Sequence, residues 1–366
     1  MIGCGMMGQE HLRNLNLIDD ANVVAVFEPD DNMAQIALAL TNGAKRTASI
    51  EELIKQENID ALVISSPNFL HAEQLEQVFQ ETKLPVLVEK PVVTQLEQVE
   101  IIRRLAERHP APVWVGMEYR YMPAIAFLIE KVNDGILGHP KMLTIREHRY
   151  PFLEKVADWN RFNRYTGGTL VEKCCHYFDL MRLLVNANPV RVMSSAGIDV
   201  NHQNERYKGE QPDILDNAYV IVEFDSGQRA MLELCMFAEG SRFQEEICVI
   251  GPEAKAEAFV PGPNRFHNPD LGTAPIPKVI ISPRDKTQPQ ELEIPVDSKL
   301  LAAGDHNGST FFQHQRFLNA IKGKGKVEVT VDDGLKAIVM GLAAQHSAQI
   351  GKTAVITNNG FSYTIS

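Results

Sequence analysis

The sequence predicts an α/β domain over residues 1–120, followed by an α+β domain with a mostly antiparallel sheet over residues 121–366. Strand and helix patterns alternate in the first third of the chain, which is typical of a parallel sheet covered by helices on both faces. Beyond about residue 120, strand patterns follow one another without intervening helices, and such strands pair mainly antiparallel. The 366 residues are enough for two domains with full cores.

The first domain begins with a glycine-rich turn and continues as alternating strands and helices. Continuous apolar runs predict buried strands over 23–27, 61–65, 85–88 and 113–116. Apolar residues at helical spacing predict helices over 9–17, 31–41, 50–56, 72–82 and 94–108. Only Met1 and Ile2 precede the turn, whereas a parallel strand there needs about five residues. We therefore expect Met1 to be an internal residue of a longer chain, rather than the start of a very short central strand.

The second domain contains consecutive strand patterns. Strands are predicted over 141–150, 190–196, 218–224, 229–236 and 243–250, and Ser226-Gly227 suits a hairpin turn between two of them. Residues 261–289 are rich in Pro, Gly, Asn and Asp, which predicts an irregular surface excursion. Helices over 309–322 and 332–350 end the pattern as packing elements that can pack back on the first domain.

Composition narrows the class of partner. The net charge of −11 and the lack of a basic cluster argue against nucleic acid and anionic membranes. No stretch reaches the roughly 18 apolar residues of a membrane helix, and no signal-peptide pattern precedes the glycines. The five cysteines are odd in number and form no CxxC pair, which favours reduced thiols and a cytoplasmic location.

The most specific signal in the first domain is the segment Gly3-Cys4-Gly5-Met6-Met7-Gly8. In a dinucleotide-binding unit the first glycine allows a tight turn, the second lets backbone approach a pyrophosphate, and the third lets the helix pack close to the sheet. Glu28 follows 20 residues after Gly8 at the end of the next predicted strand. A carboxylate there can accept hydrogen bonds from ribose hydroxyls, so the pattern predicts a dinucleotide site.

Glu28 also predicts which dinucleotide is preferred. Its carboxylate repels a 2′-phosphate, and Pro29 rather than an arginine follows it. Arg46 is the nearest cation that could offset this repulsion, and it lies in a different segment. We therefore expect NAD, with NADP less favoured.

Two further motifs follow predicted parallel strands, at the sheet edge where ligands bind in open α/β folds. The first is Ser65-Ser66-Pro67-Asn68-Phe69-Leu70-His71, and the second is Glu89-Lys90-Pro91. If the preceding strand is buried, Lys90 projects into the same crevice as the first motif. The alternative is that Glu89 and Lys90 form a solvated loop pair.

A third motif lies in the second domain, where Gly167-Gly168 precedes a predicted helix. Glu172, His176 and Asp179 are spaced to share one face of that helix. This arrangement suits proton transfer by the histidine. One alternative is a buried histidine held by a carboxylate. Another is a metal site completed by His306 or His148, which we rank below proton transfer because nothing in the spacing demands a metal.

Together these motifs resemble the glucose–fructose oxidoreductase / inositol dehydrogenase / MocA (Gfo/Idh/MocA) family over essentially the whole chain, including the closing pattern Thr330-Val331-Asp332-Asp333-Gly334-Leu335. The resemblance implies an N-terminal Rossmann domain and a C-terminal domain with an open, mostly antiparallel sheet. It also implies nicotinamide-dependent oxidation or reduction at a hydroxyl-bearing carbon of a sugar or cyclitol. The catalytic lysine and histidine of the family correspond to Lys90 and His176. Its aspartate corresponds to Glu172, which is a departure from the commonest pattern.

The chemistry of these side chains agrees with the resemblance. Oxidation of an alcohol removes a proton from oxygen, which suits His176, while the ammonium of Lys90 stabilises the developing negative charge. Glu172 is expected to orient His176 or to bind a neighbouring hydroxyl. We expect no metal in the site. The predicted substrate contacts are Lys90, Tyr119, His148, Trp159, Asn160, Glu172 and His176. The predicted cofactor contacts are Gly3, Gly5, Met6, Met7, Gly8, Glu28, Ser65, Ser66, Pro67, Asn68, His71, Glu89, Lys90 and Arg120.

Two other functions remain open. A glycoside hydrolase or lyase that oxidises its substrate transiently with tightly held NAD would show no net cofactor turnover. A nucleotide-bound sensor on the same fold would have no need of both Lys90 and His176. The sequence does not reveal the substrate, the oxidised carbon or the physiological direction.

The second sheet predicts a homodimer or homotetramer. Segments 218–224 and 229–236 carry more apolar residues than one buried face needs, and an exposed apolar face usually marks a partner site. Val220 and Val222 lie on one side of the first segment, with Tyr219 and Ile221 on the other. The alternative is that residues 261–289 fold back over that face within one chain.

Overall fold

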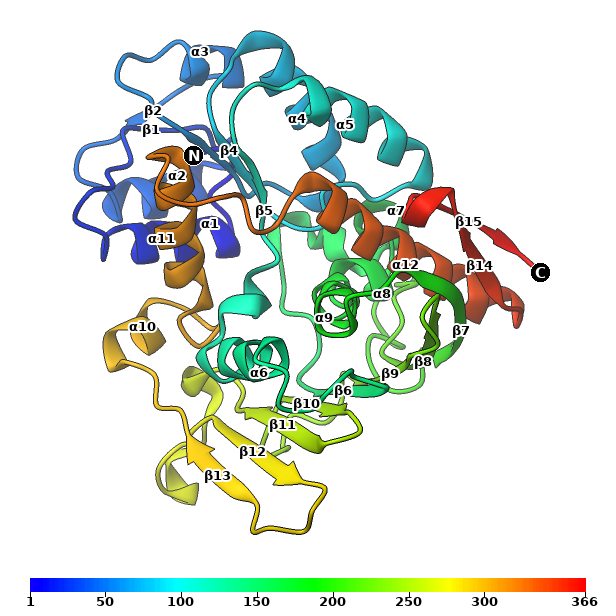
Figure 1. Cartoon of the computed structure of the whole chain (residues 1–366). Coiled ribbons are helices and arrows are strands. Elements are labelled where there is room, and N and C mark those ends of the chain that lie inside the picture. The colour runs from blue at the N-terminus through cyan, green and yellow to red at the C-terminus, as the bar shows by residue number, and fades with distance from the viewer.

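The computed structural model describes residues 1–366, and Figure 1 shows the blue to cyan N-terminal part above the green to yellow sheet of the second part. The strands of the first part are all parallel, as predicted: β1 (Ala25–Val26), β2 (Lys45–Arg46), β3 (Leu62–Ile64), β4 (Val86–Val88) and β5 (Val113–Val115). The helices between them are α1 (Met6–Leu15), α2 (Asp31–Ala39), α3 (Ile50–Ile54), α4 (His71–Glu81) and α5 (Leu96–Arg108).

Ile2 holds the central strand position of this parallel sheet. It forms parallel bridges to Phe27, next to β1, and to Ile64 in β3. Its N–H donates to the carbonyl of Val63 at 2.8 Å, and the N–H of Ser65 donates to the Ile2 carbonyl at 2.8 Å. The strands on either side are thereby joined, and the glycine-rich turn leaves the sheet from its centre.

The second part is built on one ten-stranded sheet in the order β13-β12-β11-β10-β6-β9-β8-β7-β14-β15. Every adjacent pair is antiparallel except β6 and β9, so the prediction of a mostly antiparallel, open sheet is confirmed. The predicted strands appear as β6 (Met142–His148), β7 (Pro189–Gly197), β8 (Asn217–Phe224), β9 (Arg229–Cys235) and β10 (Glu245–Ile250).

The prediction for residues 261–289 was wrong in part. This segment contains short helical turns but also a strand, β12 (Lys278–Pro283), which pairs with β11 and β13. The sequence pattern did not predict strand β12 because prolines and a loop of polar residues surround its short apolar run. Four other strands at the two ends of the sheet were also not predicted: β11 (Ala254–Val260), β13 (Gln290–Glu293), β14 (Ala354–Thr357) and β15 (Ser362–Ile365).

Helices cover one face of the large sheet and connect it to the first part. Helices α6 (Pro123–Asn133), α9 (Cys175–Val185) and α12 (Val331–Ile350) contact its inner face, and α12 also contacts α5 and β5. Helices α10 (Ser298–Ala303) and α11 (Ser309–Ile321) contact α1 of the N-terminal part. None of the helices combines the length and apolar character needed to cross a membrane, and all five cysteines are free.

The side chains that alternate with the buried ones along each strand point to the outer face of the large sheet. Val220 and Val222 are fully buried beneath the helices, so a charge introduced at either position would disrupt the core and would not report on a partner. Tyr219 and Ile221 point the other way and are 56% and 44% exposed. Residues 261–289 leave both of these side chains open, so the predicted alternative of an internal cover does not apply to this part of the face.

Candidate active site

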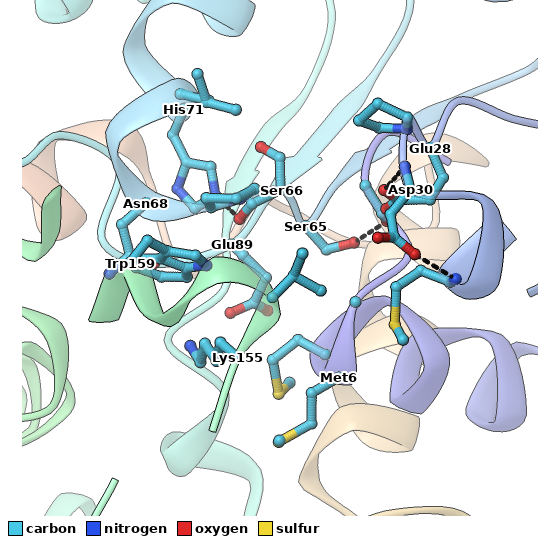
Figure 2. A pocket seen from close by; sticks show the side chains of 18 of the residues that line it. Met6, Glu28, Asp30, Ser65, Ser66, Asn68, His71, Glu89, Lys155 and Trp159 are labelled. Carbon is cyan, nitrogen blue, oxygen red and sulfur yellow. Dashed lines mark hydrogen bonds between the residues drawn. The ribbon is translucent and has the colours of Figure 1, made fainter. Parts of the chain in front are cut away.

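A cavity of about 570 Å³ opens at the carboxyl edge of the parallel sheet. Its walls come from the glycine-rich turn, the end of β1, both motifs at the strand ends and the loop over 154–159. Figure 2 shows Glu28 and Asp30 on one side of this cavity and Lys155 and Trp159 on the opposite side. Twelve predicted cofactor residues line it: Gly3, Gly5, Met6, Met7, Glu28, Ser65, Ser66, Pro67, Asn68, His71, Glu89 and Lys90.

The three glycines occupy three different environments. Gly3 has a φ of +82°, and a Cβ there would lie 2.5 Å from the backbone of Ser66. A Cβ on Gly8 would lie 2.6 Å from the carbonyl oxygen of Gly3, so Gly8 permits close packing and does not line the cavity. No atom lies within 4 Å of a Cβ built on Gly5, which leaves room for a ligand. Helix α1 begins directly after Gly5, three residues earlier than predicted, because Gly5 takes the N-cap position.

Backbone amides hold the carboxylate of Glu28 in place at the end of β1. Its two oxygens accept hydrogen bonds from the N–H groups of Cys4, at 2.7 Å, and Asp30, at 2.9 Å. The guanidinium of Arg46 donates to the carbonyls of Glu28 and Pro29 and pairs with Asp31. Acidic side chains therefore dominate this end of the cavity.

His71 and Glu89 tie the two strand-end motifs to the rest of the site. The imidazole nitrogens of His71 lie 2.7 Å from the carbonyl oxygen of Pro91 and 2.9 Å from that of Ser66. Glu89 is buried and pairs with His11 of α1 at 3.1 Å. Glu89 is therefore not part of a solvated loop pair. Lys90 is half-buried, lines the cavity and donates to the carbonyl of Glu172 at 3.1 Å.

The third motif is not one continuous helix, so this part of the prediction was wrong. Gly167 is left-handed, with a φ of +78°, and two residues separate helix α8 (Thr169–Glu172) from the start of α9. Glu172 therefore belongs to a different helix from His176 and Asp179. The carboxylate of Glu172 pairs with Lys155 at 3.2 Å and has no hydrogen bond to the imidazole.

His176 is buried, and its ring stacks on Tyr119 with a centroid separation of 4.0 Å and an angle of 8°. Its Nδ1 atom is fully buried without a partner, so only Nε2 can meet a substrate. Burial lowers the pKa of His176 well below its usual value, and the positive charges of Lys90, Lys173, His306 and Arg149 lower it further. The imidazole is therefore neutral near pH 7.

Three predicted contacts lie elsewhere. Arg120 was expected at the cofactor, but its guanidinium forms a buried two-point ion pair with Asp179, at 2.5 and 2.6 Å, and donates to the Glu328 carbonyl. Asn160 is fully buried and donates to the carbonyl of Leu153. His148 lies on the outer face of the large sheet and pairs with Glu233, whereas its neighbour Glu147 faces inward. Trp159 does line the cavity.

A buried charge cluster joins α1 to the segment before α11, and sequence reasoning missed it. His306 lies 2.8 Å from Glu10 and 3.4 Å from Glu118, and Thr310 contacts both carboxyl groups. Burial would lower the pKa of His306, but the charges of Glu10 and Glu118 outweigh this and raise it to about 9. His306 is thus the cation that compensates the charges of these carboxylates. The side chains that it clusters with are Glu10 and Glu118, and not Glu172 and His176 as the alternative of a metal site required.

Comparison with known proteins supports the assignment of the fold. Residues 1–117 match the model described as "Oxidoreductase family, NAD-binding Rossmann fold", and residues 129–356 match "Oxidoreductase family, C-terminal alpha/beta domain". The chain belongs to the Gfo/Idh/MocA oxidoreductase family. This agrees with the resemblance drawn from the motifs.

Named relatives include an inositol 2-dehydrogenase of Rhizobium meliloti, 27% identical over 63% of this chain and 66% of the relative. A glucose-6-phosphate 3-dehydrogenase of Bacillus subtilis is also 27% identical, over 57% of this chain and 59% of the relative. The alignments of two further relatives span only 61% and 60% of their lengths. Among solved structures, a putative myo-inositol dehydrogenase from Sinorhizobium meliloti shares the fold, with a TM-score of 0.76, 21% identity, and coverage of 97% of this chain and 99% of that one.

Proposed function

We propose that the protein is an NAD-dependent dehydrogenase that moves a hydride between the nicotinamide and a hydroxyl-bearing carbon of a sugar, cyclitol or related polyol. The observation that carries the proposal is the placement of Lys90 and His176. Lys90 lines the cavity and donates a hydrogen bond to the carbonyl of Glu172, the last residue of α8. Its charge is also close enough to His176, in α9, to lower the pKa of the imidazole. A neutral histidine near a lysine ammonium at the edge of the cavity suits alcohol oxidation.

Two features of the cavity support a dinucleotide as its ligand. The space over Gly5, next to the first turn of α1, can admit a pyrophosphate, which the N-terminal amides of α1 would stabilise. Glu28 lines the same cavity, and its carboxylate would accept hydrogen bonds from ribose hydroxyls. When bound, the nicotinamide accepts or donates the hydride.

The protein supplies the acid–base chemistry. Nε2 of neutral His176 can take the hydroxyl proton as the alcohol becomes a carbonyl, and return it in the reverse direction. The ammonium of Lys90 stabilises negative charge on that oxygen. Glu172 pairs with Lys155, and its main-chain carbonyl accepts a hydrogen bond from Lys90. This carboxylate would accept a hydrogen bond from a neighbouring substrate hydroxyl.

The acidic side chains at one end of the cavity support a preference for NAD over NADP. A 2′-phosphate would come close to Glu28 and Asp30, with Asp31 nearby, and the one cation there, Arg46, is already paired. The names of relatives, an inositol dehydrogenase and a sugar-phosphate dehydrogenase, support a polyhydroxylated substrate without choosing among candidates.

The direct test is a substrate panel. Purified protein is mixed with cyclitols, sugars and sugar acids, with NAD and with NADP, and reduced nicotinamide is followed by absorbance. Stoichiometric reduction with one substrate class, faster with NAD, is expected. If no member of a broad panel changes the absorbance with either cofactor, in either direction, the proposed dehydrogenase activity is wrong.

One observation favours a second candidate. A relative that is 25% identical over 62% of this chain is named a 2,7-anhydro-N-acetylneuraminate hydratase, and a hydratase adds or removes water. A lyase or glycoside hydrolase with transient oxidation could use the same two residues. Product formation without net change in the cofactor would identify this candidate. A redox-inactive sensor is not favoured, because it would have no need of both Lys90, which lines the cavity, and His176.

We also propose that the protein assembles as a homodimer or homotetramer through the outer face of the large sheet. Tyr219, Ile221, Met142 and Ile250 form part of that face, and each is more than a third exposed. An apolar face of this kind suits an isologous interface.

The free cysteines fit a reducing compartment such as the cytoplasm.

A further inference from the structure

His176 lacks the hydrogen-bond partner that usually orients a catalytic base. Its Nδ1 atom is buried and unpaired. The two carboxylates nearest to it in sequence are engaged elsewhere, Glu172 by Lys155 and Asp179 by Arg120. A base must nevertheless be held in one orientation to remove a proton efficiently. Another group must therefore fix the plane of the ring.

Tyr119 is the side chain that does so. Its ring lies parallel to the imidazole of His176, at 8° and 4.0 Å between centroids. Tyr119 is 1% exposed, and the edge of Tyr177 packs against it, with centroids 5.7 Å apart. Stacking on a buried ring restricts the imidazole to one plane, and it leaves Nε2 free.

Tyr119 is held in turn by Lys173. The ammonium of Lys173 donates a hydrogen bond to the Tyr119 hydroxyl and lies 4.7 Å from the centre of its ring. The same ammonium pairs at 2.8 Å with Glu147, which is fully buried in β6. Lys173 sits in the short turn between α8 and α9, three residues before His176. A continuous chain of contacts therefore runs from Glu147 in the large sheet, through Lys173 and Tyr119, to the imidazole of His176.

We propose that Tyr119, Lys173 and Glu147 form a clamp that positions His176, in place of a carboxylate hydrogen-bonded to the imidazole. The proposal rests on the proposed function, since it assigns positioning residues to that reaction. The clamp adds residues that do not touch the substrate to those required for turnover. It also implies that the charge of Lys173 affects the pKa of His176.

The second effect is electrostatic. Lys173, Lys90, Arg149 and His306 all place positive charge near His176, and together with burial they keep its pKa low. Loss of the Lys173 charge should raise the His176 pKa toward 6.5. Since alcohol oxidation needs neutral histidine, the acid limb of the pH profile should move to higher pH. A residue with only a structural role would lower activity without moving this limb.

The test compares Lys173→Met, Lys173→Arg, Tyr119→Phe and Glu147→Gln with Tyr177→Phe as the matched control. The ring of Tyr177 also packs against Tyr119, but the buried hydroxyl of Tyr177 has no hydrogen-bond partner. The pKa of His176 is measured by NMR titration of the NAD-loaded protein, with its signal assigned by its loss in His176→Gln. Turnover and KM are measured with the substrate found in the panel. Melting temperature and NAD affinity show whether each variant is folded.

For Lys173→Met we expect a higher His176 pKa and a fall in kcat of on the order of tenfold or more, with KM changed much less. Lys173→Arg should restore the pKa, and Tyr119→Phe should lower kcat more than Tyr177→Phe does. If Lys173→Met does not fold, Tyr119→Phe and Glu147→Gln decide the question. An unchanged His176 pKa, or equal effects of Tyr119→Phe and Tyr177→Phe, would overturn the clamp. If the wild type oxidises no substrate, the proposed function fails, while the NMR titration still tests whether the Lys173 charge acts on His176.

Discussion

Replacement of His306 by glutamine should make the stability of the protein respond differently to pH. In the folded protein His306 is enclosed by Glu10 and Glu118, and its pKa is raised from 6.5 to about 9. A group with a raised pKa in the folded state contributes stability that is fully present below pH 6.5. That contribution is lost as the pH rises through about 9.

The size of the effect follows from the shift. Each pKa unit corresponds to about 1.4 kcal/mol, so the rise from 6.5 to about 9 corresponds to roughly 3 kcal/mol of unfolding free energy. The difference in unfolding free energy between wild type and His306→Gln should therefore shrink by about this amount between pH 6 and pH 9.5. Other groups also titrate in this range, but they are common to both proteins and largely cancel in the difference.

Urea unfolding of both proteins at several pH values, followed by circular dichroism, measures this difference. Glu10→Gln provides a second arm, because it removes the closest negative charge and should weaken the pH dependence that wild type shows above pH 6.5. A difference between wild type and His306→Gln that stays constant from pH 6 to 9.5 would show that His306 is not held as a buried cation. The assigned role of the cluster would then be wrong.

Three further predictions concern function and assembly. Lys90→Ala and His176→Ala should each lower turnover by about a hundredfold or more, while calorimetry shows nearly unchanged NAD affinity. Near-normal turnover in either variant would contradict the role proposed for the replaced residue. Glu28→Ser should narrow the preference for NAD over NADP, and comparable catalytic efficiencies with both cofactors in the wild type would refute the preference itself. Tyr219→Glu combined with Ile221→Glu should shift the protein toward a monomer of 40.9 kDa in light scattering, and a wild type that is already monomeric at micromolar concentration would rule out the proposed assembly.

Local patterns predicted the parallel sheet and its cavity well. Continuous apolar runs must be buried on both faces, and the glycine-rich turn has few other uses, so neither depends on distant residues. The strands in the middle of the second sheet, such as β8 and β9, have buried residues at every second position, a pattern that can also be read locally. Strands at the ends of the large sheet were missed. In β13, exposed and charged residues replace the apolar alternation on which the prediction depends.

The candidate site shows the same division. The sequence by itself determined the glycine turn and the motifs at the strand ends, and it singled out Lys90 and His176 as the proposed reactive pair. Only the tertiary structure decided the partners: Asp179 for Arg120, Lys155 for Glu172, and Glu10, which is 296 residues away in the chain, for His306. Backbone conformation follows from neighbouring residues, whereas an ion pair or a stacked ring depends on distances that arise only when separate elements pack together. For that reason the residues that orient His176 could be seen only in the folded protein.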